Sequence, residues 1–467
     1  MSDRRLLVYI PLPPHAHWRG EGIAQTIENI LLNLPSDQKI TVLTSSEAAA
    51  TITSIFAQRS NLETMTWFGR PAAFVRTNTA TAQDLLDEAD TGVVSRVVSR
   101  FTRKATSIVA AGRYLVAKFF TDLMLRRRMI AKNCSAIWVP QLAFDVRPIS
   151  GMKKIVSFWD PFVFEYSDFG NRQSLLKLFC KRISTADAII TQSKANKSYL
   201  TEVLGLDADS ISVINNGSPD YSRLEWRHES NSEIPTDLDL YKLTNNWPAS
   251  WTDASGKRAS AAYIDDRLNH SILFRLKTDT KKTTKVIFVS TQYRPYKGFE
   301  GLFQIYDSLV RRNDGNDYRF LFTGEVPKRI KDRYSWSTSR IYELSRLSTI
   351  QHMCIYRISS LVLHPSHVEG GVGTYPTFEA ASVGVPSLMN SGRHTSELID
   401  QLAEATELVV DFAQIDQTIA AIEDLLSNEA KAQRNVEVAN KARIEWGDAA
   451  SRYATLFDRF VRETPTS

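Results

Sequence analysis

Residues 361–390 read LVLHPSHVEGGVGTYPTFEAASVGVPSLMN and predict a strand, a glycine-rich loop, a short helix and a second strand. The apolar run 361–363 is typical of a buried parallel strand. Residues 377–383 fit a helix, because Gly384 stands where helices commonly end and Pro386 just beyond it cannot continue one. The unit therefore presents a glycine loop next to a helix N-terminus, a place that favours the binding of an anion.

Two carboxylates accompany this loop. Glu369 enters it, and Glu379 lies in the first turns of the expected helix. Glycine lets backbone N–H groups approach a ligand closely, and ionised carboxylates accept hydrogen bonds from sugar hydroxyls. From the residues alone, the pattern fits either a sugar-binding loop or a tight connection that carries surface glutamates.

The stretch resembles the donor-site signature of the family 4 retaining glycosyltransferases, in which two glutamates flank a glycine loop that leads into a helix. Nine residues separate Glu369 from Glu379, so the loop is longer here than in that family. The resemblance implies that Glu369 faces the donor sugar and that Glu379 holds the nucleotide ribose. Further donor contacts are expected in the loop, at Gly370, Gly371, Gly373 and Thr374.

Two cations follow the apolar strand expected over 286–289. Arg294 and Lys297 lie three residues apart, close to the carboxyl edge of a second expected sheet. There they can clamp a diphosphate, although such a pair is also common in surface turns. The resemblance implies that both neutralise the diphosphate as it leaves. Gly324, which ends the strand expected over 318–323, is a further expected donor contact.

The chain opens with a strand at 6–10, an amphipathic helix at 23–34 and a strand at 39–44, which together start a parallel sheet. Gly22 lies in the strand-to-helix turn, at the edge where such sheets bind ligands. The resemblance implies that this loop faces the acceptor and the donor phosphates. A flexible connection is the other interpretation.

Trp159 and Asp160 follow another expected strand, at 155–158. Many members of the family have a His–Asp pair at this point, with the His on the acceptor side. Tryptophan cannot act as a base, so that role is absent here. Asp160 is a candidate for orienting the acceptor hydroxyl. A purely structural role, in which Asp160 caps a turn, fits the pattern nearly as well.

Residues 94–132 carry ten Lys and Arg residues against one acid, Asp122, with apolar residues at helical spacing between them. A basic amphipathic helix can lie on an anionic membrane surface. The same pattern is typical of a long helix that buries one face and solvates the other. No stacking platform or reader motif accompanies the charge, so we do not expect a nucleic-acid partner.

Composition narrows the class further. A length of 467 residues favours two or more domains, and a net charge of +5 is mild. No apolar run is long enough for a transmembrane helix, and the start of the chain predicts a strand rather than a signal peptide. Three scattered cysteines, all expected in the core, indicate a reduced cytoplasmic compartment. No metal-ligand spacing is present, so we expect no metal and no other cofactor.

Alternating strands and helices predict an α/β protein with two doubly wound, Rossmann-like parallel-sheet domains that face a cleft, the GT-B fold implied by the resemblance. Residues 1–217 are expected to form an acceptor domain and residues 284–445 a nucleotide-sugar donor domain. Residues 218–283 are polar and indicate an irregular linker or insertion. Residues 446–467 resemble the terminal helix of that family, which implies a helix that crosses back to the first domain.

The resemblance implies transfer of a sugar, with retention of configuration, from a nucleotide-diphosphate sugar to a hydroxyl of a glycan or lipid-linked glycan. The character of the sequence favours GDP-mannose and bacterial surface polysaccharide synthesis, in the cytoplasm or peripherally on the inner face of the membrane. Two alternatives are a catalytically weak scaffold or binding protein on the GT-B fold, and a nucleotide-sugar epimerase or hydrolase on that fold.

Overall fold

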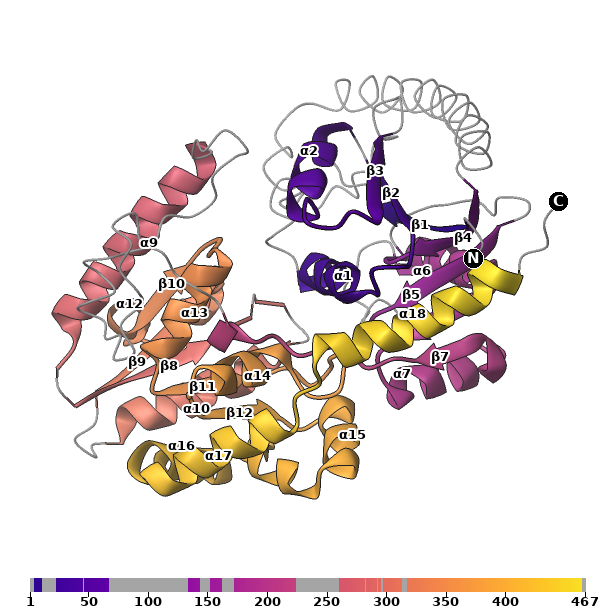
Figure 1. The fold of residues 1–467 in the computed structure, drawn as a ribbon. Coiled ribbons are helices and arrows are strands. Elements are labelled where there is room, and N and C mark those ends of the chain that lie inside the picture. The colour runs from indigo at the N-terminus through magenta and orange to yellow at the C-terminus, as the bar shows by residue number, and fades with distance from the viewer. Residues whose placement is uncertain are drawn as a thin grey trace, which may run out of the picture.

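The computed structural model of the protein has two α/β lobes, each built around one parallel β-sheet (Figure 1). The basic segment 94–132 and most of the expected insertion lie outside the residues that it describes. Those residues are 4–10, 22–44, 46–66, 133–142, 152–161, 172–223, 260–281, 283–291, 293–294, 297–312 and 317–463.

The N-terminal lobe contains a seven-stranded sheet in the order β3-β2-β1-β4-β5-β6-β7, and its paired strands are all parallel. The strands are β1 (Arg5–Ile10), β2 (Ile40–Thr44), β3 (Leu62–Thr66), β4 (Cys134–Val139), β5 (Lys153–Phe158), β6 (Ala188–Thr191) and β7 (Ile211–Val213). Its described helices are α1 (Gly22–Asn33), α2 (Ser46–Ile55), α6 (Arg172–Ile183) and α7 (Lys194–Ser198), which continues as a π-helical turn over Tyr199–Val203.

Strand β1 lies inside this sheet and is buried on both faces. Leu6 and Val8 pack into the apolar cluster that contains α1, whereas Leu7 and Tyr9 pack into the cluster on the opposite face. This two-sided burial explains the continuous apolar run of the strand, because neither face meets water.

The C-terminal lobe contains a six-stranded parallel sheet in the order β10-β9-β8-β11-β12-β13. The strands are β8 (Thr284–Val289), β9 (Asp317–Thr323), β10 (Ile341–Leu344), β11 (Leu361–His364), β12 (Ser387–Asn390) and β13 (Val409–Val410). The helices of this lobe are α9 (Ser260–Asp279), α10 (Phe299–Arg311), α11 (Lys328–Lys331), α12 (Ser337–Arg340), α13 (Thr349–Arg357), α14 (Tyr375–Ser382), α15 (Arg393–Gln401), α16 (Ile415–Ser427) and α17 (Glu429–Lys441).

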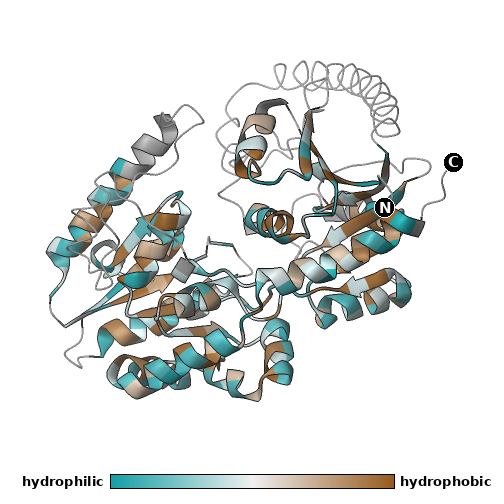
Figure 2. Ribbon diagram, in the orientation of Figure 1, coloured by the Kyte–Doolittle hydropathy of each residue, from teal (hydrophilic) through white to brown (hydrophobic). Residues whose placement is uncertain are grey.

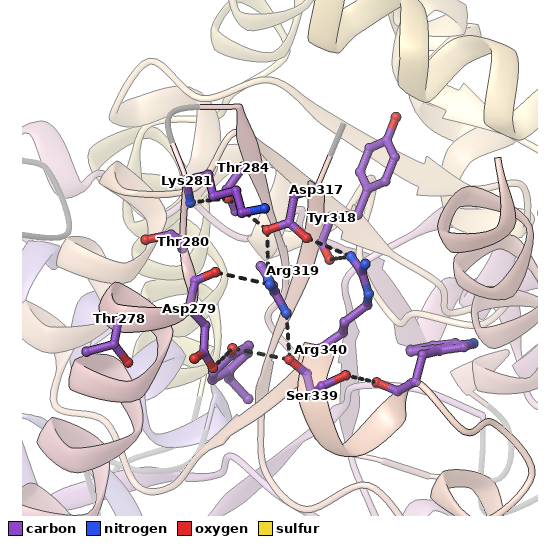
Figure 3. A network of polar contacts seen from close by, with 12 residues as sticks. Thr278, Asp279, Thr280, Lys281, Thr284, Asp317, Tyr318, Arg319, Ser339 and Arg340 are labelled. Carbon is purple, nitrogen blue, oxygen red and sulfur yellow. Dashed lines mark hydrogen bonds and ion pairs between the residues drawn. The ribbon is translucent and has the colours of Figure 1, made fainter. Parts of the chain in front are cut away.

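The prediction that 218–283 is irregular is wrong for its last part, because residues 260–279 form helix α9. Leu273 and Leu276 are fully buried against the C-terminal sheet. The C-terminal end of the helix joins a polar network around β9 (Figure 3). There Arg319 donates to the Asp279 carbonyl at 3.0 Å and the Tyr342 hydroxyl donates to its carboxylate at 2.7 Å. Helix α9 therefore belongs to the C-terminal lobe.

The last helix, α18 (Trp446–Glu463), leaves the C-terminal lobe and packs along the N-terminal one (Figure 1). Tyr453 and Phe457 are fully buried and lie 5.8 and 5.2 Å from the ring of Trp138 on β4. The chain therefore passes between the lobes twice, once after β7 and once before α18.

Hydropathy follows this layering, with apolar strands inside and polar outer faces on the helices (Figure 2). Among the residues that the structure describes, no helix is long and apolar enough to cross a membrane. Cys134 and Cys354 are buried as expected, but Cys180 is exposed on α6, so the prediction of three core cysteines is wrong for Cys180.

The predicted fold class is confirmed, and most predicted elements occur within a few residues of their expected bounds. The sequence interpretation missed α2 and β3, because the strand is short and only half-buried and carries no continuous apolar run. Strand β3 is the edge strand of the N-terminal sheet, and α2 packs next to it.

Candidate active site

The loop between β11 and α14 forms the centre of the site. Gly373 takes a φ of +68°, and its N–H donates to the His394 carbonyl at 3.0 Å. Gly384 follows α14 with a φ of +81°, which favours glycine because it has no Cβ. Pro376 stands in the first turn of α14, where its missing N–H costs nothing. The local sequence thus fixes where the helix begins and ends.

Glu369 lies in an ion pair with Lys297, which comes from the loop after β8. The same carboxylate oxygen, Oε1, lies 2.8 Å from Nε2 of His364 at the end of β11. Burial alone would raise the pKa of Glu369. The charge of Lys297 and the hydrogen bond from His364 have a larger, opposite effect and hold the pKa of the carboxyl well below its ordinary value. Glu369 is therefore an ionised acceptor at neutral pH.

A cleft of about 260 Å³ lies between the lobes at this loop. The N-terminal lobe lines it with Ile23, Thr26, Trp159, Asp160, Gln192, Asn215 and Asn216. The facing lobe contributes His364, residues 369–376 and Phe378, and the chain between the lobes contributes Ser218, Ala442 and Ile444. Both sides of the cleft offer many hydroxyl, carboxylate, amide and backbone polar groups, which suits a polyhydroxylated ligand.

The lobes are in close contact where Gly370 meets Trp159, which follows the last residue of β5. A Cβ at Gly370 would lie 1.7 Å from the carbonyl oxygen of Trp159, so only glycine fits this approach. Asn196 of α7 bridges the contact, since its Nδ2 donates to the Trp159 carbonyl at 3.0 Å and to the Gly370 carbonyl at 2.9 Å. The amide is buried, so it fixes the loop relative to the N-terminal lobe.

A second interlobe contact joins α15 to the start of α7. The buried carboxylate of Glu397 accepts hydrogen bonds from the backbone N–H of Lys194 at 2.8 Å and of Ala195 at 3.3 Å. Thr26 and Tyr375 add a hydroxyl contact at 3.1 Å across the cleft. Burial raises the pKa of Tyr375 to about 12, so its hydroxyl remains protonated at neutral pH.

Glu379, the other predicted carboxylate, is 5% exposed and lies in α14. Tyr221 donates to its Oε1 at 2.9 Å, and Tyr356 of α13 donates to its Oε2. His352 contacts the Tyr221 oxygen through Nδ1 at 3.2 Å and Ser290 through Nε2 at 2.8 Å. The carboxylate is therefore embedded in a polar cluster beside the junction of β8 and β11.

Comparison with known proteins agrees with this architecture. Residues 273–443 match the family model described as "Glycosyl transferases group 1". A glycosyltransferase from Rickettsia africae is similar over 98% of this chain and 99% of its own, with 13% identity and a TM-score of 0.54. Anabaena HepE in complex with UDP-glucose covers 97% of this chain and 99% of its own, with 12% identity and a TM-score of 0.55. The fold is GT-B.

A third GT-B structure, the α,α-trehalose-phosphate synthase (UDP-forming) from Burkholderia vietnamiensis, matches 99% of both chains at 12% identity and a TM-score of 0.56. No curated protein matches the chain. The family match covers the C-terminal lobe of the GT-B fold from within α9 to the end of α17. It includes all predicted donor residues of that lobe and supports a nucleotide-sugar glycosyltransferase.

Within the GT-B cleft, the structure brings Asp160, Glu369, Gly370, Gly371, Gly373 and Thr374 together. Lys297 joins them through Glu369. Gly22 is the first residue of α1, one residue before the lining residue Ile23. Glu379, Arg294 and Gly324 are not among the described residues that line the cleft, although Arg294 and Gly324 follow neighbouring strands at the carboxyl edge of the C-terminal sheet. The roles of all these residues stay predictions.

Several residues of the site gave no sequence signal. Asn196 and Glu397 act across the lobes, and Tyr221 reaches Glu379 over 158 residues of sequence. Such contacts depend on tertiary structure and leave no local pattern. In the described part of the chain, no group of three or more His, Cys, Asp or Glu side chains is placed to hold a metal ion.

Proposed function

We propose that this chain is a retaining glycosyltransferase that moves a sugar from a nucleotide-diphosphate donor to a hydroxyl of a glycan or a lipid-linked glycan. The observation that carries the proposal is the position of the Lys297–Glu369 ion pair beside an interlobe cleft with Asp160 on the facing lobe. Lys297 can then stabilise a leaving phosphate, and Glu369 beside it can accept hydrogen bonds from sugar hydroxyls. Asp160, the candidate acceptor-side residue, lies across the cleft from them.

The proposed mechanism assigns each residue a separate task. Lys297 and Arg294 stabilise the negative charge that develops on the leaving diphosphate, and the N–H groups of the glycine loop assist them. Glu369 accepts a hydrogen bond from a hydroxyl of the donor sugar. His364 contacts the carboxylate of Glu369 and holds it in place. Asp160 orients the attacking hydroxyl of the acceptor. The close contact of the lobes at Gly370 excludes water, which would otherwise compete with the acceptor.

The finer proposal is GDP-mannose as donor, in the synthesis of a bacterial surface polysaccharide. A panel of nucleotide sugars assayed for slow hydrolysis needs no acceptor and tests this choice directly. Fastest release of nucleoside diphosphate from GDP-mannose supports it, and a clear preference for a different base or sugar refutes it. Release of free sugar that stays fast in the presence of every glycan acceptor would favour a hydrolase instead.

A nucleoside diphosphate is expected to raise the melting temperature of the wild-type protein and to have little effect on Glu379→Gln. Ligand at about one hundred times Kd should add about 2.7 kcal/mol of stability, and loss of the ribose contact removes most of it. Differential scanning fluorimetry with GDP and UDP measures both shifts. Glu343→Gln, which alters a carboxylate paired with Lys331 elsewhere in the lobe, should respond like wild type. Equal protection of Glu379→Gln would disprove the donor site.

We also propose that residues 94–132 bring the enzyme to a membrane-bound acceptor, because ten cations there accompany apolar residues at helical spacing. The protein is expected to sediment with vesicles that contain anionic lipid at low salt and to be released as salt rises. A variant with six of the ten Lys and Arg residues changed to Gln should remain in the supernatant. Failure of the wild-type protein to bind anionic vesicles at any salt concentration would reject this role.

A further inference from the structure

Tyr221 comes from the first interlobe connection but belongs structurally to the C-terminal lobe. It lies in a 3-10 turn, Tyr221–Arg223, eight residues after the last strand of the N-terminal sheet ends at Val213. Its ring is 4% exposed and packs in the apolar cluster that contains Phe288 and Tyr356. Its backbone N–H donates to Ser382 Oγ at 3.1 Å. The side chain is therefore held rigidly against α13 and α14.

The direction of each hydrogen bond in this cluster follows from its chemistry. The Tyr221 hydroxyl donates to the carboxylate oxygen Oε1 of Glu379 at 2.9 Å. The Tyr221 oxygen is then free to accept from His352 Nδ1–H at 3.2 Å, which leaves His352 Nε2 to accept from the Ser290 hydroxyl at 2.8 Å. A continuous chain of donors thus runs from the end of β8 to Glu379.

The two tyrosines supply the hydrogen bonds that a buried carboxylate needs. Within the described part of the chain, no cation pairs with Glu379, so Tyr221 and Tyr356 each neutralise part of the charge with one donor. Burial and the charge of Glu379 raise the pKa of both tyrosines well above the ordinary value, which keeps both hydroxyls protonated. Burial lowers the pKa of His352, which therefore stays neutral.

We propose that Tyr221 is a positioning residue, which holds Glu379 in the orientation that binds the ribose hydroxyls of a nucleoside diphosphate. A carboxylate has about four lone-pair sites, and one donor on each oxygen leaves a second site on each for a vicinal diol. With each oxygen tied to a separate tyrosine, the plane of the carboxylate is fixed before the ligand arrives. This inference rests on the proposed function, because it takes Glu379 as the ribose ligand.

The test compares Tyr221→Phe with Tyr342→Phe. Tyr221→Phe removes the hydroxyl that donates to Glu379 and accepts from His352. Tyr342→Phe removes a tyrosine hydroxyl that donates to Asp279 in the polar network around β9 (Figure 3 shows Asp279). Calorimetry measures the Kd of GDP and UDP and of their 2′,3′-dideoxy forms for both variants and the wild type. Thermal melting monitors stability, which both substitutions should lower to a similar extent.

Tyr221→Phe is expected to weaken binding of the nucleotide with an intact ribose by about tenfold, the effect of one hydrogen bond to a charged group. Its affinity for the dideoxy form should change by less than about threefold, so the preference for ribose over dideoxyribose falls. Tyr342→Phe should keep the wild-type preference. A loss of stability alone would lower the affinities for the intact nucleotide and for its dideoxy form together, or change neither. The ratio of these two affinities therefore reports whether Glu379 is held in position.

The inference is overturned if Tyr221→Phe keeps the wild-type preference for ribose, or if it binds the intact nucleotide more tightly. Tighter binding would mean that Tyr221 competes with the ribose for Glu379. These results differ from a failure of the proposed function, in which the wild-type protein binds neither nucleoside diphosphate. In that case both the proposed function and the proposed role of Tyr221 are rejected.

Discussion

A Gly370→Ala variant is expected to transfer sugar about a hundredfold more slowly than the wild type, because misplacement of a reacting group by about 1 Å can cost that much. The added Cβ would lie 1.7 Å from the carbonyl oxygen of Trp159 and 3.1 Å from Asp160 Cβ. Backbone atoms cannot turn aside as the end of a side chain can. The glycine loop and the end of β5 must therefore separate.

Separation at Gly370 should also weaken the neighbouring interlobe contacts. Asn196 can no longer bridge the carbonyls of Trp159 and Gly370, and Glu397 loses its position at the start of α7. Small-angle X-ray scattering should therefore record a larger radius of gyration. Affinity for the nucleoside diphosphate should remain within about threefold of wild type, since Lys297, Arg294 and Glu379, the proposed side-chain contacts of the diphosphate and ribose, all lie in the C-terminal lobe.

Gly371→Ala is the matched control in the same loop, because alanine keeps the backbone N–H through which we expect this residue to contact the donor. Its Cβ would meet only Gln192 Oε1 within 4 Å, at 3.2 Å, and that side chain can move. We expect this variant to keep most of the wild-type rate and dimensions. A Gly370→Ala enzyme with the activity and radius of gyration of the wild type would show that close contact between the lobes is not needed for transfer.

A Lys297→Met variant is expected to lose about a hundredfold to a thousandfold in turnover, the range found when one preorganised donor to a developing negative charge is removed. The side chain of Lys297 is 15% exposed and pairs with Glu369, so its charge acts in a partly desolvated site. Initial rates of nucleoside diphosphate release at saturating donor measure the effect. The loss should appear in kcat more than in KM, because the charge on the leaving group is greatest in the transition state.

Lys331→Met provides the comparison, because Lys331 forms a similar partly exposed ion pair with Glu343 in the same lobe. Both substitutions should lower the melting temperature slightly, but only Lys297→Met should affect turnover. If both variants turn over at the wild-type rate, Lys297 does not stabilise the leaving group, and its ion pair with Glu369 has a structural purpose only.

The strand, glycine loop and helix at 361–390 could be predicted because short-range rules determine them. A continuous apolar run marks β11, while Gly384 and Pro386 mark the end of α14. The ion pair between Lys297 and Glu369 was not predicted as a contact, although both residues were chosen separately. Each follows a strand at the carboxyl edge of the same sheet, and that common edge brings them together.

The rest of the site depends on contacts that no local pattern encodes. Tyr221 stands in a polar stretch without periodicity, and only tertiary packing brings it to Glu379. Asn196 and Glu397 resemble ordinary helical surface residues until the second lobe covers them. Helix α9 was missed because charged residues interrupt the apolar periodicity of its sequence. Leu273 and Leu276 on its apolar face are nevertheless fully buried.

A crystal structure of the protein with the sugar nucleotide that the hydrolysis panel selects would test the central claim most directly. That claim is that the donor binds at the interlobe cleft and along the adjoining carboxyl edge of the C-terminal sheet, with its phosphates at the loop after β8 and its ribose at α14. We predict phosphate oxygens within hydrogen-bond distance of Lys297 and Arg294, a sugar hydroxyl on Glu369 and a ribose hydroxyl on Glu379. A nucleotide bound away from these four side chains would contradict the account.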